Sequence, residues 1–535
     1  MSMNKSTSAP SSLGEPRIIS LLWMLPVLVF LSCIAVQIQL PGLYMDAVNP
    51  DFIAAQWLHH HLRNPSAALP SKIFPLLGNL YHGVQNAYVA LPFLAILGFS
   101  VTSLRLAQAL FGVILLIAFH GITRLLSRSP WLGLAATLGL ATELAFSASF
   151  RTQFYIVMGG ATWLFVSLRL LYSLPTQSRP GRRILWAGFF SGLAGYGYFV
   201  LFFFAPGMLA IVILRKGANR HLTLCWILGF AFGLSPFVFG YISLALKLHG
   251  IGPMLHYVGN LVGQLHPFAS GSANFYYAWH MVTLALSDAG NESMIFGEPL
   301  LGWWGGIKVL VGTLSTLGTL ILLAILLWRR DPRRYTLLPV LLPVSYLLMA
   351  TLFGHRLWAH HFCVLVPFVY LLPLCLWTVT TQLLSTSTRL RLAVFLILTA
   401  LCLTINLAQQ VSFQRALAIS GGYGKSVEAL NELGIAARRA GPDVAYVFPE
   451  WGFFTSFCIL TGNQVRYVID LEPATLTKLK QQGYRELRLF YWEPPSVEGY
   501  RQQLQQAGLI ETSTQQFKTR DDKPAFYGLT ARWLP

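Results

Sequence analysis

Long apolar stretches dominate the chain and decide which elements it can form. Residues 18–45 carry no Asp, Glu, Lys or Arg, and further runs of this kind follow at 106–123, 184–214, 222–246, 309–328, 335–355, 357–388 and 392–414. A helix that crosses the roughly 30 Å hydrocarbon layer of a bilayer needs about 20 such residues. The pattern therefore predicts a polytopic α-helical membrane protein.

Basic residues gather in the short connections between these runs, and positive charge is retained on the cytoplasmic side of short loops. Placing every basic cluster inside predicts about eleven crossings, near 18–40, 104–126, 131–149, 152–172, 184–199, 200–214, 222–246, 304–328, 336–354, 358–383 and 391–413. This arrangement gives a cytoplasmic N-terminal tail at 1–17 and a membrane domain at 18–414. Its larger outer loops are 41–85 and 247–303.

Three segments are less regular than a simple crossing. Residues 184–214 predict a hairpin that turns near Gly192, Gly195 and Gly197, with two helical arms that are each shorter than a full crossing. Residues 86–98 predict an interfacial or re-entrant helix, because a crossing there would break the alternation of charge. In the first outer loop, residues 51–63 predict an amphipathic helix.

Residues 415–535 have a different pattern and predict a separate soluble domain on the outer side. Helical patterns at 425–440, 473–482 and 496–507 alternate with strand-like runs at 445–448, 465–469, 487–491 and 526–531. Alternating strands and helices are typical of a small α/β sandwich.

Composition narrows the function classes. Only 11% of the residues are charged, and the formal net charge is +18. No aromatic and basic nucleic-acid module accompanies this charge, so we expect no nucleic-acid partner. The six cysteines include no CxxC pair, and five of them lie in apolar segments, which argues against disulfide or zinc chemistry.

One segment resembles a phosphate-binding loop at first sight. Residues 421–426 read GGYGKS, but the full pattern needs a glycine at 419, where Ile419 stands. We therefore expect a linker between the last helix and the soluble domain.

A few polar residues in or beside the apolar runs are candidates for chemistry. Glu143 lies inside an apolar crossing near Arg151, where an acid is costly unless it is paired or faces a cavity. His360 and His361 begin a late crossing. They follow His355 by five and six residues, whereas a helical zinc pair needs a spacing of three or four, which favours interfacial histidines.

Asp46 is the most informative candidate because it follows the first crossing directly. A carboxylate at the outer mouth of a helical bundle can act as a general base when the nucleophile comes within hydrogen-bond reach. The alternative, from composition alone, is a solvated loop aspartate.

The sequence around Asp46 resembles that of a known superfamily. Residues 41–55 read PGLYMDAVNPDFIAA, and further stretches of the same kind are YHGVQNAYVALPFLAILG at 81–98, SLRLAQALFG at 103–112, SFRTQ at 149–153 and WAHHFCVLVPFVYLLP at 358–373. Together they resemble the GT-C superfamily of glycosyltransferases, which use lipid-linked sugars. The nearest branch comprises the bacterial relatives of protein O-mannosyltransferases and of the lipid A aminoarabinose transferase.

The resemblance implies roles for individual residues. Asp46 matches the catalytic aspartate of the first outer loop, but Ala47 stands where many relatives have glutamate, so only Asp51 is left as a second acid. His82, Arg105 and Arg151 match positions of the family's blocks.

The family's late Arg-Tyr pair is absent, and its nearest basic substitutes are Arg356, His360 and His361. Lys72, Arg105, Arg151 and Arg356 are the expected ligands of the donor phosphate. Asp51, His82, Glu143, His360 and His361 are further cavity candidates. A divalent metal is an alternative that this pattern does not favour, and no other cofactor is expected.

The implied function is an inverting transfer of a sugar from polyprenyl phosphate to a lipid, glycan or protein acceptor, with Asp46 as base. The implied location is the outer face of a bacterial cytoplasmic membrane. Two other hypotheses stay open at this point. One is a transporter or flippase for a lipid-linked or polar solute, which the absence of internal repeats disfavours. The other is a non-catalytic partner in envelope assembly.

Overall fold

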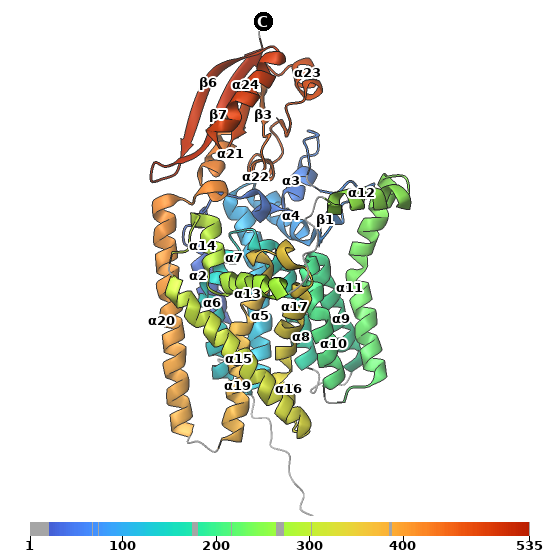
Figure 1. The fold of residues 1–535 in the computed structure, drawn as a ribbon, viewed down its shortest axis with the longest axis vertical. Helices are drawn as coiled ribbons and strands as arrows, with labels where there is room; N and C mark the ends of the chain where they lie inside the picture. The colour runs from blue at the N-terminus through green and yellow to red at the C-terminus, as the bar shows by residue number, and fades with distance from the viewer. Residues whose placement is uncertain are drawn as a thin grey trace, which may run out of the picture.

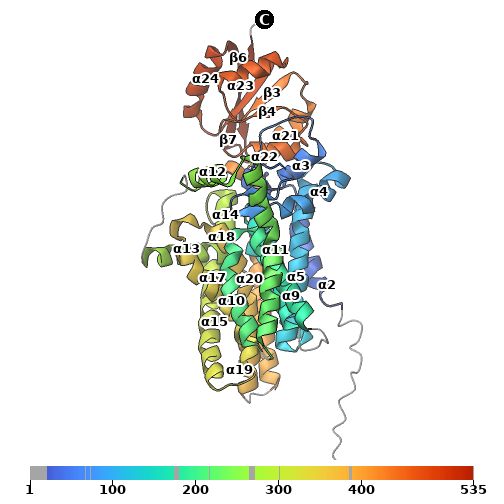
Figure 2. The same ribbon diagram turned by 90° about the vertical axis from the view of Figure 1, so that its right-hand side faces the viewer.

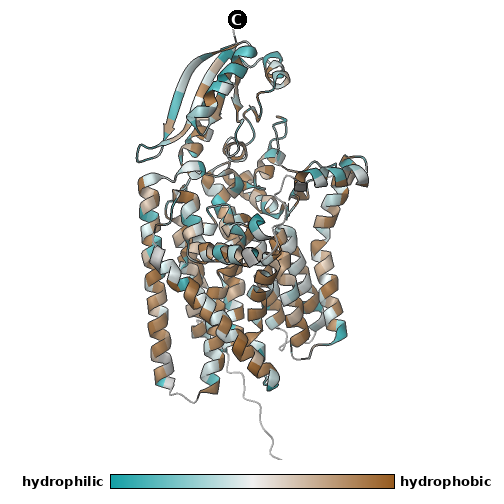
Figure 3. Cartoon of the chain, in the orientation of Figure 1, coloured by the Kyte–Doolittle hydropathy of each residue, from teal (hydrophilic) through white to brown (hydrophobic). Residues whose placement is uncertain are grey.

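The chain forms a bundle of helices with a small α/β domain at one end (Figure 1). The computed structural model describes residues 21–66, 68–72, 74–173, 180–215, 217–263, 272–300, 302–384 and 388–533. The expected N-terminal tail at 1–17 lies outside the described residues. Apolar residues cover the long helices, whereas polar residues are more frequent in the C-terminal domain (Figure 3).

Seven helices of the described chain are long and apolar enough to cross a membrane: α5 (Val101–Ser127), α8 (Phe154–Tyr172), α11 (Arg220–Lys247), Trp304–Trp328 of α15 (Gly302–Trp328), Arg334–Thr351, Ala359–Leu383, and Ala393–Ser420 of α20 (Thr388–Ser420). Two of these spans are composite. The first comprises α16 (Arg334–Leu337), η4 (Leu338–Val340) and α17 (Leu341–Thr351), and the second comprises α18 (Ala359–Phe362), η6 (Cys363–Leu365) and α19 (Phe368–Leu383). The prediction of a polytopic helical membrane protein is confirmed.

The other expected crossings are shorter or broken. Residues 18–40 contain α2 (Met24–Ala35), and the expected crossing at 131–149 is divided into α6 (Pro130–Thr142) and α7 (Leu144–Ser149). Glu143 lies at the break, where its backbone is extended and its side chain caps the N-terminus of α7. The count of eleven full crossings therefore stays a prediction. At 131–149, a polar residue at the break interrupts the expected continuous apolar helix.

The expected hairpin at 184–214 is present, and it divides at Tyr198, directly after Gly197. Its arms are α9 (Pro180–Gly197) and, after η3 (Phe199–Phe204), α10 (Ala205–Leu214). Other glycines of these helices allow close packing. A Cβ on Gly188 or Gly192 of α9 would overlap the backbone of α11, and one on Gly233 of α11 would overlap the backbone of α9. Small residues four positions apart allow such a close approach of two membrane helices.

Short elements connect the bundle to the C-terminal domain (Figures 1 and 2). They include η1 (Met45–Val48), α3 (Phe52–Leu58), the two-stranded β1 (Leu77–Asn79) and β2 (His82–Gly83), α4 (Gln85–Leu97), α12 (Ile251–Gly263) and α14 (Ala289–Phe296). The helix α13 (Ser272–Leu286) packs on α18 at the side of the bundle. The expected helix at 51–63 is shorter than predicted, and the expected helix at 86–98 is α4.

The C-terminal domain is the predicted α/β fold. Its sheet has the order β4-β3-β5-β7-β6, in which β3 pairs in parallel with β4 and β5, and β7 pairs antiparallel with β5 and β6. The strands are β3 (Val444–Val447), β4 (Tyr467–Val468), β5 (Glu486–Tyr491), β6 (Leu509–Lys518) and β7 (Pro524–Trp533). The helices are α21 (Ala429–Arg439), α22 (Phe454–Leu460), α23 (Pro473–Gln481) and α24 (Val497–Gln506).

Two elements and one boundary of this domain were not predicted. β6 is a mostly exposed edge strand with a polar sequence, so it lacks the alternation of apolar residues that marks a half-buried strand. α22 is short and buried throughout, so it shows no amphipathic period. The preceding helix α20 continues to Ser420, beyond the expected boundary at 414.

The domain is packed tightly onto the segment that follows α2. Asn431 of α21 accepts a hydrogen bond from the amide of Leu43 at 3.1 Å and donates one to the carbonyl of Gln39 at 3.1 Å. Farther along, the Asn64 amide donates to Asn463 at 3.0 Å. A shared apolar core that includes Met45, Phe52 of α3 and Phe457 of α22 lies between these contacts. The domain and the segment around Asp46 are therefore parts of one packed unit.

Candidate active site

Asp46 lies in η1, where the bundle meets the C-terminal domain. Its carboxylate is partly exposed, and Oδ2 accepts a hydrogen bond from the Tyr44 hydroxyl at 2.7 Å. Burial raises the pKa of the carboxyl above its ordinary value, while hydrogen bonds from Tyr44 and Trp451 and the positive charge of Lys425 lower it. The net effect is a raised pKa, which makes the ionised carboxylate a stronger base than a solvated aspartate.

The loop that follows β3 brings Trp451 to Asp46 from the C-terminal domain. The Gly452 amide donates to the Met45 sulfur at 3.4 Å, and the Trp451 carbonyl accepts from the Trp492 indole at 2.8 Å. Gly452 has φ +122°, and a Cβ there would lie 2.8 Å from the Trp492 ring. The glycine thus allows the close turn that carries Trp451. Sequence reasoning missed this residue, because 405 positions of chain, from 46 to 451, separate it from the carboxylate.

Lys425 reaches the site from the GGYGKS segment between α20 and α21. The Tyr423 amide donates to the Ile295 carbonyl at 2.8 Å, and the Gly42 amide donates to the Ser426 carbonyl at 2.9 Å. The exposed Lys425 between these bonds is close enough for its charge to act on Asp46. The segment is a connection, as predicted, but it is bonded to the bundle and supplies a cation to the site.

Tyr81 and Tyr198 connect Asp46 with the candidate histidines. Tyr81 lies at the turn between β1 and β2, where burial and then the charge of Asp46 raise its pKa to about 12. Its ring centroid is 5.5 Å from that of Tyr198 and 5.3 Å from that of His82. The Tyr198 hydroxyl is 3.1 Å from Nε2 of His361. These side chains form an aromatic wall that leads from the carboxylate toward α18.

Each histidine of this aromatic wall lies close to a defined neighbouring group. His82 is buried and its Nδ1 lies 3.0 Å from the Gly83 carbonyl, and burial lowers its pKa to about 4, so the ring is neutral at physiological pH. The rings of His360 and His361 are 3.9 Å apart, and Nδ1 of His360 is 3.3 Å from the Gln153 amide. The structure thus brings three sequence candidates, His82, His360 and His361, to the same aromatic wall.

Two of the expected phosphate ligands hold the backbone before Asp46 instead. Arg105 of α5 donates to the carbonyls of Ile38, Leu40 and Pro41, at 2.6 Å for the first and the last. Arg151 donates to five carbonyls, which belong to Cys33, Ile34, Val36, Gln37 and Leu40. Carbonyls at a helix C-terminus lack intrahelical partners, and these guanidinium groups satisfy them. Within the described chain, both guanidinium groups thus hold the backbone that leads to Asp46, and their contact with the donor phosphate stays a prediction.

The remaining expected cations are less enclosed. Lys72 is exposed on the connection between α3 and β1. Arg356 is half-buried in the turn η5 (Gly354–Arg356), just before α18 and its histidines. Both stay candidates for contact with an anion.

Asp51 does not pair with Asp46. It is fully buried, and neither of its oxygens has a hydrogen bond of good geometry within the described chain, although Gln108 and Tyr155 lie close to it. Complete burial raises its pKa well above the ordinary value. In the described ranges, no three His, Cys, Asp or Glu side chains come together as a metal site.

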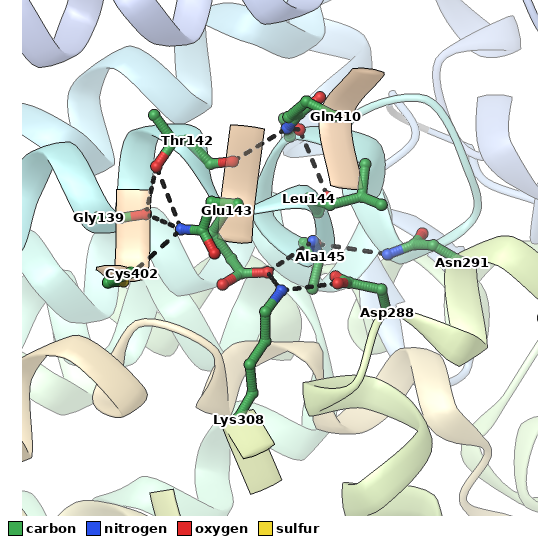
Figure 4. A network of polar contacts seen from close by, with 12 residues as sticks. Gly139, Thr142, Glu143, Leu144, Ala145, Asp288, Asn291, Lys308, Cys402 and Gln410 are labelled. Atoms are coloured by element: carbon green, nitrogen blue, oxygen red, sulfur yellow. Dashed lines mark hydrogen bonds and ion pairs between the residues drawn. The ribbon is translucent and has the colours of Figure 1, made fainter. Parts of the chain in front are cut away.

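Glu143 belongs to a separate buried network inside the bundle (Figure 4). Lys308 of α15 forms ion pairs with Glu143 and with Asp288, the second at 2.7 Å, and all three side chains are buried. Tyr370 donates to Oε2 of Glu143. Of the two roles that the sequence leaves open for Glu143, the structure shows a buried ion pair, and its cation is Lys308.

The comparisons with known proteins rest on structure alone. No protein-family model matches the chain, and no curated protein is similar to it in sequence. ArnT from Cupriavidus metallidurans in the apo state is similar to it over 96% of this chain and 98% of that chain, with a TM-score of 0.57 and 13% identity. The chain has a GT-C fold.

Two further structures agree with this fold. ArnT bound to undecaprenyl phosphate gives a TM-score of 0.53 at 12% identity, with 96% and 98% of the two chains covered. The apo oligosaccharyltransferase of Archaeoglobus fulgidus gives 0.52 at 13% identity, with 90% of this chain and 70% of that chain covered. The likeness extends through the C-terminal domain, because the match to ArnT covers nearly the whole of both chains.

Proposed function

We propose that this protein is a membrane glycosyltransferase that moves a sugar from a polyprenyl-phosphate donor to an acceptor, with Asp46 as the general base. The observation that carries this proposal is the environment of Asp46. The carboxylate is partly exposed, has a raised pKa, and lies among a tyrosine, a tryptophan and a lysine at the end of the bundle. The GT-C fold supports the proposal, since one protein with this fold binds undecaprenyl phosphate.

The reaction is a single displacement. An acceptor hydroxyl or amine attacks the anomeric carbon from the face opposite the phosphate, and Asp46 takes the acceptor's proton. The bond between the anomeric carbon and the phosphate oxygen breaks, and the electron pair leaves with polyprenyl phosphate. The glycoside therefore forms with inverted configuration. A base of this kind contributes typically 10²–10⁴-fold to the rate.

The leaving phosphate needs positive charge close to Asp46. Lys425 satisfies this requirement because it is exposed and acts electrostatically on the carboxylate. Arg356 and Lys72 are further ligands in this proposal. Cations placed where negative charge develops lower the barrier in a site that excludes water.

The membrane orientation is part of the same proposal. The N-terminus lies in the cytoplasm of a bacterial cell, the bundle spans the cytoplasmic membrane, and the C-terminal domain lies on the outer face. The positive-inside distribution of basic residues supports this orientation. The acceptor is a lipid, glycan or protein that reaches the site between the bundle and the domain.

The test is transfer by the purified protein in detergent or lipid nanodiscs. Incubation with polyprenyl-phosphate sugars should release polyprenyl phosphate in the wild type and at least 100-fold more slowly in Asp46→Asn. Asp522→Asn, at an exposed position of the C-terminal domain, serves as the matched control. Retained turnover in Asp46→Asn would show that Asp46 is not the base.

A transporter would give a different result. It would move a lipid-linked or polar solute across proteoliposomes without cleaving the bond between sugar and phosphate. No release of polyprenyl phosphate from any lipid-linked pentose or hexose, together with solute movement, would refute the enzyme assignment.

A further inference from the structure

A second basic site lies at the end of the bundle farthest from the C-terminal domain. A cavity of about 520 Å³ opens there between the ends of α5, α8, α10 and α19 and the start of the span that begins with α16. Its lining includes three arginines, Arg128, Arg215 and Arg333, together with Tyr172 and Tyr335. The α16 end of the bundle and the sheet of the C-terminal domain lie at opposite ends of the molecule (Figure 1).

Two of these arginines have no counter-charge within the described chain. Nη1 of Arg215 is buried without a hydrogen-bond partner, although burial of such a donor normally requires one. Arg128 is exposed at the end of α5, and it has no side-chain hydrogen bond or ion pair with the described residues. Arg333 differs, because it pairs with Asp331, with Nε 3.0 Å from Oδ1.

Retention of positive charge on one side of the membrane explains why basic residues occur at this end of the bundle. It does not explain why two arginines line a cavity without a counter-charge. Arg128 and Arg215 directly follow the last turns of α5 and α10, so they could satisfy the free carbonyls there. They make no such side-chain bonds within the described residues. They line a hollow instead, and the Arg215 guanidinium keeps an unused donor.

The rest of the lining shows what kind of ligand fits. Leu125, Leu126, Leu171, Ile211 and Leu338 provide an apolar wall beside the arginines. A molecule with a phosphate and a hydrocarbon chain would match both the arginines and this apolar wall. Basic pockets between membrane helices on the cytoplasmic side are a known mode of binding anionic lipid head groups.

We propose that this cavity binds the phosphate of an anionic phospholipid. Arg128 and Arg215 hold the phosphate oxygens, and the apolar wall takes the first part of an acyl chain. The free Nη1 of Arg215 is the donor that the lipid satisfies. This site is separate from Asp46, and the inference does not rest on the proposed glycosyl transfer.

The test measures lipid binding by the purified full-length protein in nanodiscs of phosphatidylcholine. Titration with phosphatidylglycerol, followed by native mass spectrometry, should show saturable binding in the wild type and at least tenfold weaker binding in Arg128→Gln/Arg215→Gln. Arg182→Gln/Arg220→Gln removes the same charge from two exposed arginines outside the cavity lining and should bind like the wild type. The conservative Arg128→Lys/Arg215→Lys should retain most of the binding.

Three outcomes would overturn the proposal. Equal weakening in both glutamine pairs would show general surface charge rather than a site. Equal binding of added phosphatidylcholine and phosphatidylglycerol would show that the arginines do not select an anion. If inorganic phosphate bound as tightly as phosphatidylglycerol, the ligand would be a soluble phosphate and not a lipid. The lipid titrations of the wild type decide the second and third outcomes even if a variant does not fold.

Discussion

Thr455 of the C-terminal domain donates a 2.8 Å hydrogen bond to the backbone carbonyl of Met45, the residue directly before Asp46. The donor belongs to α22 and the acceptor to η1, at opposite ends of the chain. Together with the bonds of Asn431 to Gln39 and Leu43, this contact fixes the backbone that presents the carboxylate. The C-terminal domain is thus structurally part of the candidate active site, and the predictions that follow depend on this arrangement.

The first prediction concerns the acidic limb of the pH profile. The hydrogen bond from Trp451 lowers the pKa of Asp46, so Trp451→Phe should raise that pKa further. Because the base must be ionised, activity is lost as the pH falls through this pKa. The acidic limb of kcat/KM should therefore move to higher pH in Trp451→Phe, measured across pH 4 to 9 with the released polyprenyl phosphate as readout. Tyr44→Phe should move it in the same direction, and an unchanged limb in both variants would contradict the assignment.

The second prediction separates Lys425 from other lysines of the domain. If Lys425 contacts the donor phosphate, Lys425→Gln should raise KM for the polyprenyl-phosphate sugar by about tenfold, which equals about 1.4 kcal/mol of binding. Lys425→Arg should keep most of the affinity because it keeps the charge. Lys478→Gln in α23 removes a lysine of the same domain without a shared contact and serves as control. A lower kcat with unchanged KM in Lys425→Gln would argue against phosphate contact.

The third prediction assigns a structural role to Arg151. Arg151→Gln removes the charged donor that satisfies five backbone carbonyls at the end of α2 and directly after it. A hydrogen bond to a charged group contributes about 1.5–3 kcal/mol, so the loss in stability should be at least of this order. Thermal unfolding in detergent, followed by tryptophan fluorescence, should show a lower melting temperature. An unchanged melting temperature with a raised donor KM would instead favour the phosphate role that the sequence indicated.

The fourth prediction tests the buried network around Lys308. Lys308→Met leaves the carboxylates of Glu143 and Asp288 buried without their cation, and breaking a buried ion pair in this way costs about 3–5 kcal/mol. The triple variant Lys308→Met/Glu143→Gln/Asp288→Asn removes all three charges and should recover part of that loss. If Lys308→Met alone were as stable as the wild type, the network would have no structural importance.

The sequence predicts the fold better than it predicts the site. Apolar run lengths identify the long helices, since a bilayer-spanning helix leaves a continuous signal. The same signal fails at Glu143, because the cation that makes this acid tolerable lies 165 positions away in α15. Strands β3, β5 and β7 were predicted from their apolar residues, whereas the polar edge strand β6 was not.

Within the candidate site, the sequence points to the proposed base but not to its surroundings. Asp46 stands out because a carboxylate directly follows an apolar helix. Trp451 and Lys425 carry no local signal, since only the docking of the C-terminal domain brings them to Asp46. The sequence also does not show that Arg105 donates to backbone carbonyls, because a positive charge in a sequence does not reveal its partners. Each of these contacts forms only in the folded chain, so no short sequence pattern predicts it.

The docking of Thr455 and Asn431 onto the backbone before Asp46 also limits how such proteins can be recombined. A chimera that takes its membrane half from one protein and its outer domain from a distant relative would join two surfaces that never adapted to each other. The unit of exchange is instead discontinuous: residues 36–66 must travel with residues 421–533, even though all the long helices of the bundle lie between them in the gene.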